Sequence, residues 1–267
     1  MTTNNIELYS GQHAIEVEQF AIVFRNPIDS GDAGRFEENI ENIKGFFAAV
    51  DDPDVFQFSV GPSTPTPPIL KQLTEFGRDG KPSWSGHFGE NAIAVASRRY
   101  TGWQEIWPQV QERLAVLLEC VDPFKSVGSI EFSVTDNLRE GLPKDNSKPH
   151  LLSRNIFRKG TWVPDHLLDY EDPRWDFDGG KFIESNSETE ELERLEAKGV
   201  IQGGYVVATL CNTFSLRFKK NIKLRDLFDD GKIEGKTLET FERFHDLNKE
   251  TIKTVLVDPL LERMGLE

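Results

Sequence analysis

The chain has 267 residues, of which 37% are hydrophobic and 28% charged, and its formal net charge is −14. This composition is that of a globular protein and excludes collagen-like, low-complexity and fully disordered chains. The acidic excess repels phosphate backbones, so we expect no general binding of DNA or RNA. We expect no membrane segment and a cytoplasmic location, because no apolar run is long enough for a span and residues 1–19 lack a signal-peptide pattern.

Four segments of the first half alternate apolar and polar residues, as strands with one buried face do. They span residues 16–25, 55–60, 91–98 and 129–135. Residues 36–50 and 103–118 instead have the three-to-four-residue apolar spacing of an amphipathic helix. Thr101 and Gln104 have the spacing of a capping box for the second helix, and Pro108 predicts a kink near its start.

The predicted order is therefore strand, helix, strand, strand, helix, strand, which is the split βαβ pattern of ferredoxin-like folds. It predicts an antiparallel sheet with both helices on one face, in a first half that covers residues 1–140. A turn-rich segment at 141–149 then predicts a linker or loop.

The second half has weaker patterns. Residues 150–157 and 181–184 are weak strand candidates. Ser185 and Glu188 have capping-box spacing for a short charged helix, which Gly199 is placed to end.

Two longer elements follow. Residues 200–218 are rich in β-forming side chains, and Gly203–Gly204 predicts a bend or bulge among them. The last element is an amphipathic helix over 238–264, with a late kink at Pro259. We therefore predict an α+β protein in which a second antiparallel sheet-plus-helix half, residues 150–267, packs with the first as one compact unit.

Short catalytic motifs are missing from the chain. It has no P-loop, dinucleotide-binding, nucleophile-elbow or HExxH motif, and we predict no cofactor and no assigned catalytic residue. The two cysteines, Cys120 and Cys211, form no disulfide framework or metal motif, and we expect both to be buried, unreactive thiols.

One candidate site is an acidic segment. It contains His166, Glu171, Asp176 and Asp178, and hard cations prefer several oxygen ligands on a flexible loop. A divalent metal held there would activate water for hydrolysis. The alternative, which we favour, is a solvated acidic loop closed by Gly179–Gly180.

Three single residues are candidates for contact with a ligand or partner. Trp84 and His87 lie in a Gly-rich segment outside any periodic stripe, where we expect a loop, and an aromatic residue on such a loop is a plausible contact. His245, followed by Asp246, lies within the last helix and could act as a general base or ligand. The alternatives, which we favour, are a buried tryptophan that anchors the loop and a histidine at the edge of the core.

Two further groups favour structural roles. Tyr100, Trp103 and Trp107 could form a stacking platform, but they continue a helical stripe and so indicate core packing. The basic residues of 217–225 could contact an anion, but lysines at an exposed strand end also block edge-to-edge pairing.

The segment 99–138 begins with Tyr100-x-x-Trp103 and continues with an amphipathic helix and a strand. Together with an acidic strand near the N-terminus and His245 in the last helix, this order resembles a sporadically distributed, uncharacterised bacterial protein family. The strand after the helix often ends in a Tyr-x-Asn-like motif in that family; Phe132 and Asn137 are the nearest residues here, at a different spacing. The resemblance implies a bacterial or phage origin and a patchy distribution, typical of defence, toxin-immunity and mobile-element proteins, and it implies no site residues.

These observations predict a non-catalytic binding or regulatory protein that acts through contacts with a protein partner or a second copy, in a bacterial defence, toxin-immunity or mobile-element system. Two alternatives stay open. One is a metal-dependent hydrolase or nuclease centred on the acidic segment. The other is a nucleotide or small-ligand sensor with a pocket between the two halves and Trp84 or His87 at its mouth.

Overall fold

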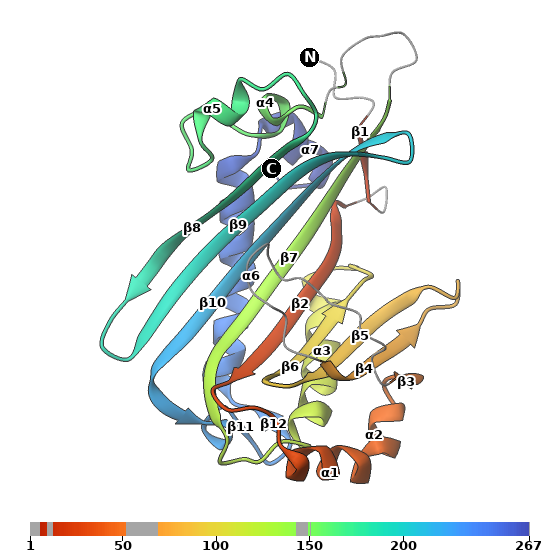
Figure 1. Ribbon diagram of the computed structural model, residues 1–267, viewed down its shortest axis with the longest axis vertical. Helices are drawn as coiled ribbons and strands as arrows, with labels where there is room; N and C mark the ends of the chain where they lie inside the picture. The colour runs from red at the N-terminus through yellow and green to blue at the C-terminus, as the bar shows by residue number, and fades with distance from the viewer. Residues whose placement is uncertain (1–5, 10–12, 52–68, 143–148, 150, 267) are drawn as a thin grey trace.

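One antiparallel sheet runs through the molecule (Figure 1). The computed structural model describes residues 6–9, 13–51, 69–142, 149 and 151–266. Within them, ten strands form this sheet: β1 (Ile6–Leu8), β2 (Ile15–Phe24), β3 (Ala49–Asp51), β4 (Ile69–Phe76), β5 (Pro82–Gly89), β6 (Ala92–Ser97), β7 (Ser126–Gly141), β8 (Trp175–Ser185), β9 (Thr189–Gln202) and β10 (Tyr205–Lys223). Their order is β3-β4-β5-β6-β2-β7-β10-β9-β8, and β1 pairs with one end of β7.

Helices cover one face of this sheet. The helices of the described residues are α1 (Ser30–Glu38), α2 (Ile40–Lys44), α3 (Trp103–Leu118), α4 (Ser153–Ile156), α5 (Asp165–Leu168), α6 (Gly235–Val255) and α7 (Asp258–Met264). Figure 1 shows α3 and α6 on the same side of the sheet, behind the strands. A small ribbon of β11 (Phe228–Asp229) and β12 (Lys232–Ile233) precedes α6. No helix among the described residues has the length and apolarity that crossing a membrane requires.

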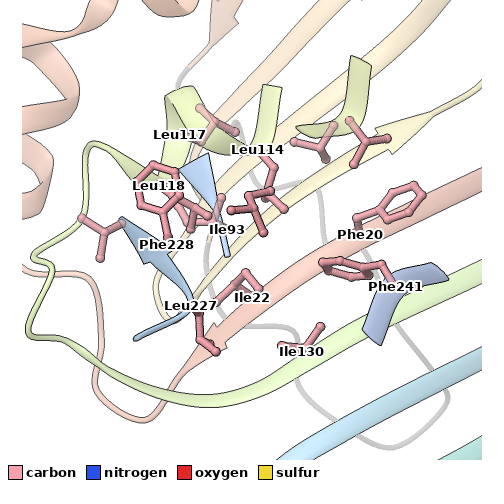
Figure 2. Close-up of a cluster of buried hydrophobic side chains, with 14 of the residues drawn as sticks. Phe20, Ile22, Ile93, Leu114, Leu117, Leu118, Ile130, Leu227, Phe228 and Phe241 are labelled. Carbon is pink, nitrogen blue, oxygen red and sulfur yellow. The ribbon is translucent and has the colours of Figure 1, made fainter. Parts of the chain in front are cut away.

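The larger of two hydrophobic clusters lies between the sheet and the two long helices. Strands β2 and β7 direct every second side chain toward the helices, because side chains alternate faces along a strand. Phe20 of β2 therefore packs against Phe132 of β7, with ring centroids 5.0 Å apart, and edge-on against Phe241 of α6 at 5.5 Å. Leu114 and Leu117 of α3 complete this part of the cluster (Figure 2).

A second hydrophobic cluster lies farther along the same face. It is formed by the distal ends of β7, β9 and β10, by the end of α6, and by α4, α5 and α7. Because β7 and β10 pair along most of their lengths, the two halves of the chain share one sheet.

The structure confirms an α+β protein with a large antiparallel sheet, and several predicted elements are present. The strands predicted at 16–25, 91–98 and 129–135 are β2, β6 and β7, and the helix predicted at 103–118 is α3, which continues through Pro108. The segment 55–60 lies outside the described residues.

Other predictions for the first half are wrong. In place of one helix over 36–50, the chain forms α1, α2 and then β3. The helix starts early because the Asp29 carboxylate accepts from the backbone N–H groups of Gly31 and Asp32, and Asp32 in turn accepts from Asp29. No side chain caps α3, whose N-cap is Gly102. Three strands, β3, β4 and β5, also come between α2 and β6, so the simple predicted order is not followed.

The helix predicted from Ser185 to Gly199 is also wrong, because these residues belong largely to β9. Its glutamate- and leucine-rich sequence has a local preference for helix, but hydrogen bonding to β8 on one side and β10 on the other overrides it. Gly199 does not end a helix. It lies opposite Trp175 of β8, and a side chain there would meet the Trp175 ring and the Pro173 carbonyl oxygen.

The remaining segments differ in detail. Residues 150–157, predicted as a strand, contain the short helix α4, whereas the strand predicted at 181–184 lies within β8. Gly203 and Gly204, with φ of 59° and 84°, form a tight turn between β9 and β10 instead of a bend within one strand. The last predicted helix is two helices, and Pro259 lies in the first turn of α7, where proline is tolerated.

Candidate functional site

A layer of buried polar side chains separates the two hydrophobic clusters. Four strands each contribute an inward-facing polar residue to this layer, at positions of the kind that apolar residues occupy elsewhere, and α6 adds three more. We call these residues the polar layer: Glu18 of β2, Asp136 of β7, Asn212 of β10, Glu193 of β9, and His245, Asn248 and Thr251 of α6. All seven are buried, with at most 7% of their surface exposed.

The positions follow from the strand register. Glu18 and Asn212 both lie opposite Val134, on either side of β7, so the three share a face. Asp136 is two residues beyond Val134 and therefore points to that same face. The polar residues thus interrupt the same inward rows that contain Phe20, Phe132 and Phe214.

One side of the polar layer is largely paired within the protein, although Asn212 Oδ1 has no hydrogen-bond partner among the described residues. The Glu193 carboxylate accepts hydrogen bonds from the Thr251 hydroxyl and from Asn212 Nδ2, the latter at 3.2 Å, and pairs with Lys181 Nζ at 3.0 Å. Asn212 Nδ2 also donates to Asn248 Oδ1 at 3.1 Å. These contacts give the β9–β10 side of the polar layer a structural role.

The other side is not satisfied. Both carboxylate oxygens of Glu18, Oδ1 of Asp136 and both ring nitrogens of His245 have no hydrogen-bond partner among the described residues. A buried polar group without a partner destabilises a protein by about 1–3 kcal/mol, and more if it is charged, so such groups are rare in native structures. Five such atoms in one place indicate that these side chains face a ligand or solvent.

A cavity of about 80 Å³ adjoins these three side chains. It lies at the junction of the two halves, between the start of β2, the loop before α3, α6 and the end of α7. Its other lining residues are His13, Ala14, Ile15, Tyr100, Asn248, Lys249, Ile252, Met264 and Leu266.

Burial shifts the protonation of the groups around the cavity. It raises the pKa of Glu18 to about 8, an effect to which the nearby Asp136 carboxylate adds and which Lys249 opposes. Burial also raises the pKa of Asp136 to about 7. It lowers the pKa of His245 to about 4, with Lys249 acting in the same direction and Asp246 opposing it. At neutral pH the imidazole is therefore uncharged, and the two carboxyl groups retain protons to a substantial degree.

Aromatic rings fix the walls of the cavity. The His245 ring stacks on Trp103 with 3.9 Å between centroids and 12° between planes, and Trp103 stacks in turn on Trp107. His13 meets the Tyr100 ring edge-on at 5.3 Å. Burial, followed by the Glu18 carboxylate, raises the pKa of Tyr100 to about 12, so its hydroxyl stays protonated.

Of the residues singled out in the sequence, the structure places His245 and Tyr100 at this cavity. Trp84 and His87 do not lie in a loop; they belong to strand β5, where β4 and β6 pair on both sides. Trp84 is buried beneath the Arg113 guanidinium, 4.4 Å from the ring centroid. Neither residue lines the cavity.

The acidic segment does not form a single centre. His166 lies in α5, and Asp176 and Asp178 lie in β8. Arg194 binds both oxygens of Asp178 at 2.7 and 2.6 Å, and Arg154 lies 3.6 Å from Glu171. Within the part of the chain that the structure describes, no group of three or more His, Cys, Asp or Glu side chains could hold a metal ion.

Glu18 and Asp136 are not among the residues that the sequence patterns single out. Their signal is a carboxylate at the inward position next to an alternating apolar row, two residues before Phe20 on β2 and two residues after Val134 on β7. A charged residue at such a position is rarely buried without a partner, and so it marks a candidate site.

Comparison with known proteins gives no further guide, since no family model, curated protein or solved structure matches this chain. The resemblance to a sporadically distributed bacterial family stays a prediction.

Proposed function

We propose that this chain is a non-catalytic binding protein that holds a small molecule in the cavity between its two halves. The observation that carries the proposal is the set of five buried polar atoms on Glu18, Asp136 and His245 that lack partners beside one cavity. Binding sites typically combine apolar walls with a few convergent polar groups, and residues with shifted pKa values concentrate there.

The size of the cavity limits the ligand. An engineered apolar cavity of about 150 Å³ accepts benzene, so a volume near 80 Å³ takes only a few non-hydrogen atoms. A whole nucleotide does not fit, which favours the small-ligand form of the predicted sensor.

Two predictions remain part of this proposal. One is the protein partner or second copy, in a defence, toxin-immunity or mobile-element system, which would respond to the occupied state. The other is a ferredoxin-like unit in the first half. It is supported by the neighbour order β5-β6-β2-β7, antiparallel throughout, with α1–α2 and α3 in the connections.

The test uses Met264, which lines the cavity and is one of only two methionines in the chain. We expect a mixed library of cationic, anionic and neutral fragments to contain compounds that shift the Met264 methyl resonance of ¹³C-methyl-methionine protein and raise the Tm. Met264→Leu assigns the signal. Ala14→Leu, which fills the cavity without altering its charge, should abolish binding while the protein stays folded.

If no fragment of any charge shifts this methyl group or raises the Tm, the cavity is not a binding site and the proposal is wrong. Native mass spectrometry of protein purified from its own host gives an independent measurement, in which we expect an added mass of small-molecule size.

A further inference from the structure

We propose that the ligand of this cavity is a small primary ammonium ion, held between the carboxylates of Glu18 and Asp136. This inference rests on the proposed function and specifies its ligand class.

The first argument is the match between donors and acceptors. Glu18 offers two oxygens without partners and Asp136 offers one, and carboxylates that are ionised only accept hydrogen bonds. An ammonium group has three N–H donors and no acceptor, so it pairs with all three oxygens. An anionic ligand would instead add negative charge beside two acidic groups.

The second argument is charge balance around the cavity. Two acidic groups face it from the sheet, Glu18 and Asp136, and one basic side chain, Lys249, faces it from α6. The imidazoles of His13 and His245 and the phenol of Tyr100 complete the titratable groups of the lining. Burial lowers the pKa of both imidazoles and raises that of the phenol, so these three groups are largely uncharged near neutral pH. With both carboxyl groups ionised, the described groups of the lining carry a net charge of −1, which one monovalent cation neutralises.

Lys249 does not occupy this position itself. Its ammonium lies 3.9 Å from Asp246 Oδ1, and its side chain is 43% exposed. Among the described residues that line the cavity there is no other lysine or arginine, so we assign the cation beside Glu18 and Asp136 to a ligand.

The third argument is the shape and lining of the cavity. A volume of about 80 Å³ accepts an ammonium group with a short alkyl chain, and Ile15, Ile252 and Met264 provide apolar walls for that chain. The Tyr100 ring adds an aromatic surface, which attracts cations. The described residues show no cluster of ligands for a metal ion, which favours an organic cation.

Proton release is the expected signature of binding. The two carboxyl groups retain protons near neutral pH in the free protein, and a bound cation stabilises their ionised forms. Binding should therefore release protons, and affinity should rise as the pH increases through the range of about 7 to 8.

The experiment is isothermal titration calorimetry with ethylammonium chloride at pH 6.5 and pH 8.5, in buffers of different ionisation enthalpy. Ethylammonium remains protonated at both values, as a lysine side chain does. Ethanol, acetate, guanidinium, tetramethylammonium and potassium serve as comparison ligands. We expect ethylammonium to bind best, at least tenfold more tightly at pH 8.5 than at pH 6.5, with net proton release.

Variants locate the site. Glu18→Gln and Asp136→Asn should each weaken ethylammonium binding at least tenfold. Glu193→Gln is the matched control, because Glu193 is a buried carboxylate of the same polar layer that pairs within the protein and does not line the cavity. It should bind ethylammonium as the parent protein does. If one of the two site variants does not fold, the other variant and the pH dependence of the parent protein still decide the question.

The outcomes separate the two proposals. Binding of ethanol or acetate in place of ethylammonium would overturn the ammonium assignment and leave the binding function intact. Potassium binding as tightly as ethylammonium would likewise overturn it in favour of an inorganic cation. If none of these probes binds and the fragment library also shifts nothing at Met264, both proposals are wrong.

Discussion

Glu18→Gln tests whether the central carboxyl group is destabilising in the ligand-free protein. Burial raises the pKa of Glu18 from 4.5 to about 8, so between these pH values the folded state holds a proton that the unfolded state has lost. Stability from this group is therefore fully present below about pH 4.5 and is lost as the pH rises through 8. Glutamine has a similar shape and cannot ionise, so it removes this loss.

The size of the effect follows from the pKa difference. Each pKa unit corresponds to about 1.4 kcal/mol, so the change between pH 5 and pH 8 amounts to roughly 3 to 4 kcal/mol. We expect the difference in unfolding free energy between Glu18→Gln and the parent protein to shift by this amount in favour of the variant from pH 5 to pH 8. For a chain of this size, that shift corresponds to roughly 10 °C in Tm.

The assay is urea unfolding of both proteins at several pH values from 5 to 8, without added amines. Glu239→Gln, an exposed position on α6, corrects for the substitution itself. A difference in unfolding free energy between Glu18→Gln and the parent protein that stays constant across this range would refute the argument. It would show that the Glu18 carboxyl group is solvated or paired in the folded protein.

Further predictions concern packing and reactivity. Gly203→Ala places a side chain at φ 59° with nothing within 4 Å, so we expect a loss of about 1 kcal/mol in unfolding free energy from backbone strain alone. Gly199→Ala has no such space and should lose about 2 to 3 kcal/mol in unfolding free energy. Equal losses for the two variants, measured by chemical denaturation, would contradict this contrast. Cys120 is fully buried, and burial raises its pKa to about 12, so we expect no alkylation at pH 8 until the protein unfolds. Modification in the native state, measured by mass spectrometry, would show that the site is open.

Sequence periodicity predicts the helices and strands whose buried contacts come from one regular row of apolar residues. Strands β2 and β7 and helices α3 and α6 each have an apolar row at the spacing of their secondary structure, and the structure confirms them. Strand β9 has the composition of a helix and becomes a strand only through pairing with β8 and β10. Its inward glutamates, Glu191 and Glu193, are neutralised by Arg243 and Lys181, which no local pattern predicts.

The candidate site could be predicted only in part, because most of it depends on contacts between segments that are distant in the sequence. His245 is recognisable because a histidine within a helical stripe is unusual. Glu18 and Asp136 are 118 positions apart in the sequence, and only the pairing of β2 with β7 brings them together. Their shared environment depends on strand register, which is a property of the whole sheet.

The contact between Phe20 and Phe241 has a consequence for synthesis of the protein. More than 200 residues separate these two rings, so the ribosome must translate for roughly 10 to 40 s after β2 is made before α6 exists to cover it. During that interval the inward aromatic row of β2 has no complete partner surface. The nascent chain therefore exposes part of this row, and with it a risk of aggregation, until α6 emerges.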